Sequence, residues 1–186
     1  LKVQAAYDAK NAYLRFQWKT QRNAPGIEYP YYRFDGKDWK IQGFPKLDQV
    51  VQEGKQPGIY EDRLSLMVDD GKVPMFAKQG CWLTCHDGLR DMPQVGSGPD
   101  AQKFIKKADV RKYLPVSRTD PTDWRTIKSP EELARIKAEG GFVDLIQWRA
   151  HRSNPVGRAD DGFVLEYRNF DAGKNHFASN MDGATK

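Results

Sequence analysis

The feature that most constrains the fold of this 186-residue chain is a regular alternation of side chains near its start. In residues 12–19, Leu14, Phe16 and Trp18 occupy every second position, and the residues between them point to the opposite side. A period of two indicates a β-strand that buries one face. Residues 3–7 form a second strand-like run before a short turn, so the sequence predicts an antiparallel hairpin.

More strands are predicted further along the chain. Residues 64–68 are mostly apolar and are followed by Asp-Asp-Gly, which is typical of a strand that ends in a turn. Residues 142–149 and 162–168 have the same character and flank a turn-rich loop. Residues 21–60 are rich in Pro, Gly and Tyr and lack a clear period, so we expect long loops with short strands there.

Helices are predicted in the second half of the chain. Asp100 and Asp109 are each placed to cap a short helix, the second of which must stop before Pro115. A third helix is predicted to begin at Ser129, because Pro follows at the first helical position and Glu at the third. It should end at Gly140 and the glycine after it.

The composition is that of a globular domain, with 39% hydrophobic and 30% charged residues. The apolar stretches are too short to span a bilayer. The chain begins inside a strand-like pattern, so we expect either that a leader has been removed or that the domain is part of a longer chain. The predicted fold is mainly β, an antiparallel β-sandwich with helical insertions, as a single domain over residues 1–186.

The formal net charge is +5, which raises the question of an anionic partner. The basic residues are scattered, and their densest group lies on one predicted helical stretch, residues 103–112. This distribution favours a solvated helix face over a nucleic-acid site. A docking surface for an acidic redox partner is compatible with either interpretation.

Chemistry-bearing residues gather at one place. The chain has two cysteines and three histidines, and three of these five residues are Cys81, Cys85 and His86. Two thiols followed directly by a histidine are typical of covalent haem attachment, in which the thiols bond to the haem vinyl groups and the imidazole binds the iron. The usual spacing has two residues between the cysteines, whereas this chain has three. A bulge or a looser turn is needed to accommodate the extra residue.

Three other interpretations of the same residues stay open. A zinc site needs a fourth ligand, and no second cluster with suitable spacing is present in the sequence. A disulfide between Cys81 and Cys85 is sterically possible but leaves His86 unexplained. A thiol redox motif needs two intervening residues and a helix N-terminus.

Several short segments carry a family resemblance. They include residues 80–88 and 109–118 and, above all, the run Trp-Arg-Ala-His-Arg-Ser-Asn-Pro at 148–155 with Ala-Asp-Asp at 159–161. In these segments the chain resembles the haem-binding domain of ethylbenzene dehydrogenase and related dimethyl-sulfoxide-reductase-type systems. The resemblance implies a β-sandwich that holds one haem, is exported from the cytoplasm and exchanges electrons with a partner. Members with b-type haem use Met and Lys as axial ligands, and the paired cysteines here indicate a c-type variant, which leaves the axial ligands open.

His86 is the expected first axial ligand of the iron, and the second must come from elsewhere. We favour His151, which follows a predicted core strand, with Met75 as the alternative. The remaining candidates are a lysine and the residues His176, Met67, Met92 and Met181.

Other residues are expected near a haem. Trp82 and Leu83 can lie against the porphyrin, and Phe76 can exclude water, although ordinary core packing explains all three equally well. Arg90 and Arg149 can pair with the propionates, but surface exposure is the more common state of a single arginine.

The predicted function is periplasmic electron transfer by one haem c, because an iron with two protein ligands has no open position for a substrate. The chain is then an electron carrier and not an enzyme, with a redox partner in a membrane-bound or multi-subunit respiratory complex. Two alternatives stay open: a haem-based sensor with a weakly held sixth ligand, and a haem-free carbohydrate-binding module with a Cys81–Cys85 disulfide. The second would use an aromatic platform made of Trp18, Tyr29, Tyr31, Tyr32 and Trp39.

Overall fold

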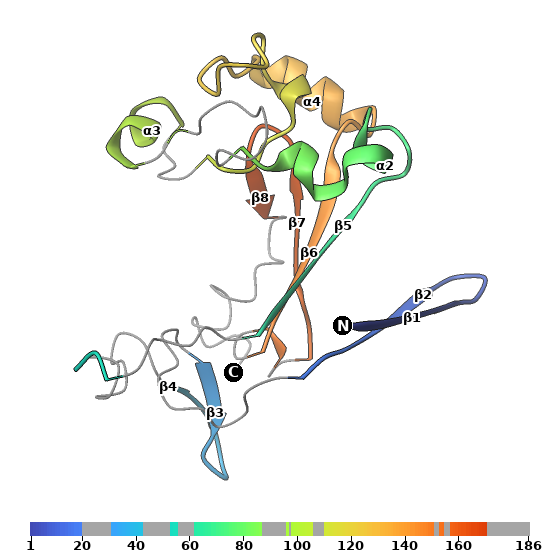
Figure 1. Cartoon of the computed structure of the whole chain (residues 1–186), viewed down its shortest axis with the longest axis vertical. Coiled ribbons are helices and arrows are strands. Elements are labelled where there is room, and N and C mark those ends of the chain that lie inside the picture. Colours follow the sequence, from blue (N-terminus) through green and yellow to red (C-terminus); the bar gives the residue numbers. More distant parts are fainter. Residues whose placement is uncertain are drawn as a thin grey trace. The chain divides into compact units, whose positions relative to one another are not determined.

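The computed structural model describes residues 1–19, 31–42, 53–55, 62–86, 96, 98–105, 110–150, 153–154 and 157–170. The chain divides into two compact units, Leu1–Asp62 and Arg63–Lys186. Each unit is built from antiparallel β-strands, which confirms the predicted mainly β character, and Figure 1 labels the elements of both. In the part of the chain that the structure describes, no helix has the length and apolar character needed to cross a membrane.

The first unit contains two hairpins. Strand β1 (Lys2–Tyr7) pairs antiparallel with β2 (Ala12–Gln17), as the alternation predicts. Asp8 closes the turn, because its Oδ1 atom accepts hydrogen bonds from the backbone N–H groups of Lys10 and Asn11. Strands β3 (Tyr31–Phe34) and β4 (Trp39–Gln42) form the second hairpin, in agreement with the short strands expected there.

The prediction that one face of the first hairpin is buried is wrong for Leu14, which is 45% exposed. Phe16 and Trp18, on the same face, are only half-buried. Pairing with β1 satisfies the backbone of β2, but neither hydrophobic core cluster of the described residues includes side chains of this hairpin.

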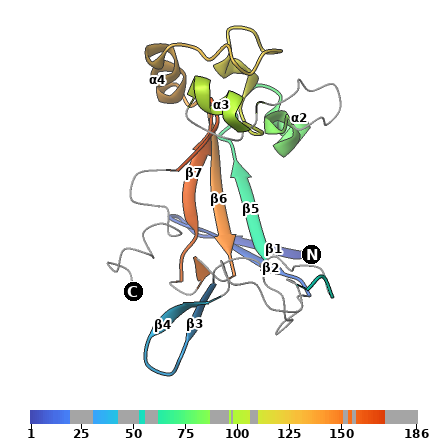
Figure 2. The same cartoon turned by 90° about the vertical axis from the view of Figure 1, so that its left-hand side faces the viewer.

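The second unit is organised around one four-stranded antiparallel sheet in the order β5–β6–β7–β8. Its strands are β5 (Arg63–Val68), β6 (Val143–Arg149), β7 (Asp160–Val164) and β8 (Arg168–Phe170). The strands predicted at 64–68 and 142–149 are confirmed. Figure 2 shows that the helices of this unit gather at one end of its sheet.

The strand predicted at 162–168 is confirmed only over residues 162–164, because the chain turns after Val164. Strand β7 ends at Val164, the N–H of Leu165 donates to the carbonyl of Tyr167, and β8 begins at Arg168. Gly162 makes the pairing possible: a Cβ atom at this position would lie 2.2 Å from the carbonyl oxygen of Asn169.

The helical segments of the second unit are short. They are α2 (Phe76–Gln79), the 3-10 helix η1 (Gly80–Thr84), α3 (Gly98–Ile105), the 3-10 helix η2 (Pro115–Ser117) and α4 (Pro130–Ala138). Helix α4 has the predicted capping box between Ser129 and Glu132, and Gly140 follows it with a positive φ of 84°. Asp100 lies in the first turn of α3 instead of capping it.

The second helix predicted in this region, capped by Asp109, is wrong over its described residues 110–114. Residues 111–113 instead pair with residues 84–86 around an isolated bridge between Cys85 and Lys112: the N–H of His86 donates to the carbonyl of Arg111, and the N–H of Tyr113 donates to that of Thr84. A partner segment 27 residues away in sequence therefore overrides the local helical signal.

Two core clusters hold the second unit together. The larger one contains Val73, Leu83, Leu114, Ile136, Val143 and Leu165. The smaller one contains Ala101, Val110 and Tyr113, with Trp124 packed against it. Residues 84–86 pair with residues 111–113. Leu83, directly before the first segment, belongs to the larger cluster, and Tyr113 of the second segment belongs to the smaller one, so this pairing connects the two clusters.

Candidate functional site

The paired cysteines lie on and directly after η1. Cys81 is within this 3-10 helix, and Cys85 follows its last residue in an extended conformation, with φ −98° and ψ 119°. Thr84 is fully buried and tightens the turn, because its Oγ1 atom donates to the carbonyl of Cys81 at 2.9 Å. The three residues between the thiols therefore form a defined turn.

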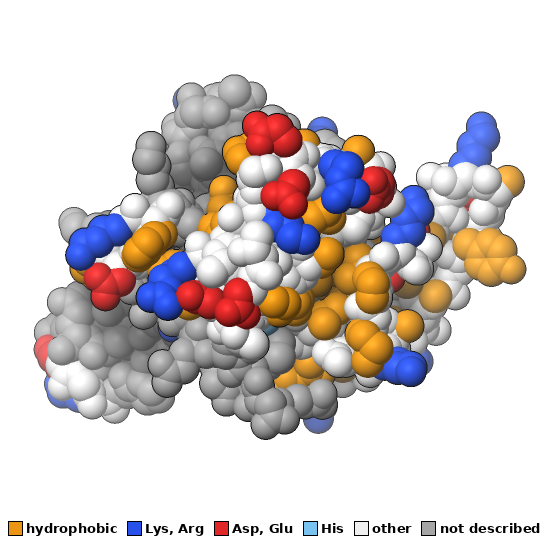
Figure 3. Space-filling model, turned by 90° about the horizontal axis from the view of Figure 1, so that it is seen from above, with side chains coloured by type: hydrophobic (Ala, Val, Ile, Leu, Met, Phe, Trp, Pro, Cys, Tyr) orange, Lys and Arg blue, Asp and Glu red, His pale blue; other side chains and the backbone are white. Residues whose placement is uncertain are grey.

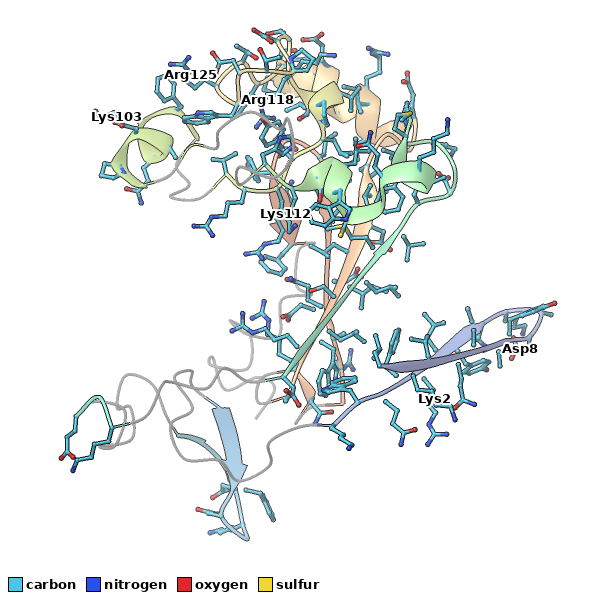
Figure 4. The ribbon with its side chains drawn as sticks, viewed as in Figure 1. Lys2, Asp8, Lys103, Lys112, Arg118 and Arg125 are labelled. Atoms are coloured by element: carbon cyan, nitrogen blue, oxygen red, sulfur yellow. The ribbon has the colours of Figure 1, made fainter. Side chains whose placement is uncertain are left out.

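Both thiols are free. Cys81 is exposed and Cys85 is partly buried, so neither is sealed inside the core. The Nζ atom of Lys112 donates to the Sγ atom of Cys85 at 2.9 Å. Lys112, labelled in Figure 4, lies beside η1 because its backbone forms an antiparallel bridge with Cys85.

His86 is completely buried. Its imidazole ring stacks on the phenol ring of Tyr113, with a centroid distance of 3.6 Å and an angle of 7° between the planes. One ring nitrogen, Nε2, lies 2.9 Å from the carbonyl oxygen of Tyr113, to which it can only donate. The other, Nδ1, has no hydrogen-bond partner among the described residues.

The environment of His86 keeps its imidazole neutral. Burial lowers the pKa of His86 from 6.5 to about 4, and the positive charges of Arg118 and Lys112 act in the same direction. The hydrogen bond to the Tyr113 carbonyl opposes the shift but does not cancel it. Neutral imidazole is the form that binds metals.

These residues fit a covalently attached haem. Two free thiols precede a neutral imidazole that has one nitrogen fixed by a backbone carbonyl and the other without a partner among the described residues. Metal-binding histidines usually have this second hydrogen bond, which fixes the orientation of the ring. Among the described residues, no group of three or more His, Cys, Asp and Glu side chains is placed to hold a free metal ion.

The residues expected to surround a haem fall into two groups. Leu83 is buried in the larger core cluster and Phe76 packs against it, so their contacts are those of core packing. Trp82 is 44% exposed and Met75 is 48% exposed, so both present apolar surface near the cysteines in sequence. Met67 is half-buried on β5, with its Sδ atom 3.9 Å from the Oγ1 atom of Thr84.

The structure places neither the remaining sixth-ligand candidates nor the two arginines expected near the propionates at the site described above. The sixth-ligand candidates His151, His176, Met92 and Met181, and also Arg90, lie outside the described residues. The expected exposure of Arg149 is wrong, because its side chain is buried and pairs with that of Asp160 at 3.3 Å. The buried carboxylate compensates the charge of the buried guanidinium.

Sequence reasoning missed three residues that define the site: Lys112, Tyr113 and Arg118. Lys112 and Tyr113 meet the cysteine motif through long-range backbone pairing, and Arg118 reaches it by lying over the ring of Tyr113. No local pattern identifies them, although they belong to the family-like segment 109–118. On the face drawn in Figure 3, positive and negative side chains are interspersed with hydrophobic ones.

Comparisons with known proteins identify two cytochromes c and one protein family that match this chain. Cytochrome c-551 of Rhodocyclus tenuis is 33% identical over 82 residues, which are 44% of this chain and 30% of that protein. Cytochrome c-552 of Stutzerimonas stutzeri is 28% identical over 112 residues, 59% of this chain and 28% of that protein. The matched regions thus span less than a third of either relative, and no solved structure matches. The sequence model of the family described as ethylbenzene dehydrogenase matches residues 1–186, and the chain therefore belongs to that family.

Proposed function

We propose that this chain is a periplasmic electron-transfer cytochrome domain with one haem c, bound through Cys81 and Cys85 with His86 as an axial ligand. The family and the two cytochrome c relatives support a haem cofactor with its iron. The observation that carries the proposal for these residues is the buried, neutral His86 that directly follows two free thiols.

Cys81 and Cys85 would hold the haem through thioether bonds to its vinyl groups. Addition of each thiol S–H across a vinyl group would consume no oxidant, because the sulfur would take one vinyl carbon and the hydrogen the other. His86 would keep Nε2 on the Tyr113 carbonyl while its other nitrogen, Nδ1, would be available to hold the iron. When bound, the haem supplies a one-electron ferric–ferrous couple.

We propose His151 as the sixth ligand and Met75 as the alternative. Met75 is exposed and follows Pro74 directly at the start of α2, where its φ of 68° is unusual for a residue other than glycine. Two protein ligands leave no open iron position, which favours electron transfer over substrate chemistry or gas binding. A Met ligand would raise the reduction potential relative to a second His.

The wider setting is also a proposal. We place the chain in the periplasm, because thioether-bound haem and the relatives' class of protein agree with an exported domain. Its partner would be a redox protein of a membrane-bound or multi-subunit respiratory complex, as expected for this family. We also propose the finer fold class that the sequence predicts, an antiparallel β-sandwich with helical insertions.

Covalent attachment is tested by expression with an export signal in a host that matures c-type cytochromes. We expect a mass equal to the polypeptide plus one haem, and colour that stays with the protein on acid–acetone extraction. Cys81→Ser and Cys85→Ser together should make any haem extractable, and Lys78→Ala, an exposed change on α2, should leave it attached. The bare polypeptide mass in the unchanged protein would refute the proposal.

The sixth ligand is tested by the ferric absorption spectrum. His151→Ala should convert a low-spin spectrum to a high-spin or ligand-exchanged one, whereas Met75→Ala should leave it low-spin. A sulfur-to-iron band in the unchanged protein would contradict His151 and point to a methionine.

A further inference from the structure

Three planar groups are stacked at the site. The imidazole of His86 lies 3.6 Å from the Tyr113 ring, and the Cζ atom of Arg118 lies 4.1 Å from the centroid of that same ring. Groups this close cannot share one face of a ring, so the phenol lies between the imidazole and the guanidinium. Figure 4 shows Arg118 on the same side of the second unit as Lys112.

The guanidinium of Arg118 is fixed in position. The residue is 2% exposed and donates three hydrogen bonds of 2.7 Å, to the carbonyls of Trp124 and Glu166 and to the Oγ atom of Ser117. All three acceptors are neutral. Among the described residues, no carboxylate lies within ion-pair distance of Arg118, in contrast to Arg149 with its partner Asp160.

Arg118 therefore contributes a buried positive charge. Burial lowers its pKa only to about 10, so the side chain stays protonated at neutral pH. Water does not reach the space between the stacked groups, which are all buried, and the charge is screened less than one at the surface.

A positive charge near an iron centre destabilises the ferric state more than the ferrous state, because the ferric iron carries one more positive charge. The same stack fixes the plane of the imidazole, since Tyr113 is clamped between His86 and Arg118. A guanidinium suits this role because it can lie over the ring while its N–H groups donate hydrogen bonds to other acceptors.

We propose that Arg118 is a positioning residue that acts through Tyr113 on His86: it raises the reduction potential of the bound haem and fixes the orientation of the axial imidazole. This inference rests on the proposed haem function. It adds a residue that belongs neither to the cysteine motif nor to the candidate ligands.

The test uses the haem-loaded protein and its midpoint potential. Arg118→Gln should lower the potential, because the buried charge is lost while hydrogen-bonding capacity remains. Arg135→Gln is the matched control: it removes an exposed arginine of α4 and should leave the potential unchanged. A haem-loaded Arg118→Gln protein with the potential of the unchanged protein would overturn this inference alone.

A second variant covers the case in which Arg118→Gln does not fold. Arg118→Lys keeps the charge but cannot lie flat on Tyr113 while reaching three acceptors. We expect a potential close to that of the unchanged protein together with shifted electron paramagnetic resonance g-values, which report the orientation of the ligand plane. Unchanged g-values would refute the positioning role. Unchanged protein that is exported without haem would instead overturn the proposed function, and this inference with it.

Discussion

His86 is held neutral by burial, and this couples its protonation to unfolding in the haem-free chain. Its pKa is about 4 in the folded protein and near its ordinary value of 6.5 in the unfolded chain. The unfolded state binds more protons between these values, so stability is complete above pH 6.5 and falls as the pH drops toward 4. We expect a loss of roughly 3 kcal/mol at most over this window. Urea unfolding at a series of pH values measures it, and His86→Gln should flatten the dependence; parallel curves for the two proteins would contradict the assignment.

Asp160 is expected to contribute to the free energy of unfolding, because its carboxylate compensates the charge of Arg149 inside the second unit. Asp160→Asn keeps the shape but leaves a buried guanidinium without its carboxylate, which should cost about 3 kcal/mol. Equilibrium denaturation measures the change. Glu139→Gln, which breaks an exposed pair with Arg135, should have little effect, and equal effects of the two substitutions would show that burial is unimportant here.

At the scale of single residues, the sequence predicts the candidate site residues but not their surroundings. Cys81, Cys85 and His86 are recognisable because their spacing is itself the signal. Tyr113 and Arg118 are not, because their roles arise from contacts with residues far away in sequence. The burial of Arg149 was missed for the same reason: its partner lies on the neighbouring strand, and a lone arginine in a sequence is most often exposed.

Among the elements, α4 is the one whose start depends on a single side chain. The Oγ atom of Ser129 accepts from the N–H of Glu132, and the Glu132 carboxylate accepts from the N–H of Ser129. Ser129→Ala should therefore lower the free energy of unfolding by about 1 kcal/mol. Glu131→Ala, one position away and outside the box, is the control for thermal or urea denaturation. A Ser129→Ala protein as stable as this control would show that the box contributes nothing.

The elements also show where prediction from sequence works. The capping box and the first hairpin were predicted because their signals lie within a few residues, in the Ser-Pro-Glu-Glu run and in the alternation at 12–19. The helix expected after Asp109 failed because residues 111–113 pair with residues 84–86. The strand expected at 162–168 is correct only over residues 162–164, because its turn depends on close backbone approach at Gly162.

For the whole molecule, the division into two units has a testable consequence. Cys81, Cys85, His86 and both described core clusters belong to Arg63–Lys186. Removal of residues 1–62 should therefore preserve covalent haem attachment and the far-ultraviolet circular dichroism of the sheet. The mass and the spectrum of the shortened protein, beside those of the full chain, measure this. Loss of haem with a retained fold would show that the first unit contributes to the site.

The backbone hydrogen bonds beside the cysteine motif have a consequence for the rate of electron transfer. Residues 84–86 are hydrogen-bonded to residues 111–113, and the next residue, Leu114, donates to Leu165 at the end of β7. These hydrogen bonds connect the segment that contains His86 to the end of an inner strand of the sheet. An iron bound to His86, as we propose, would change its charge while its ligand barely moves. The reorganisation energy of the redox change is then small, and rapid electron self-exchange is the expected result.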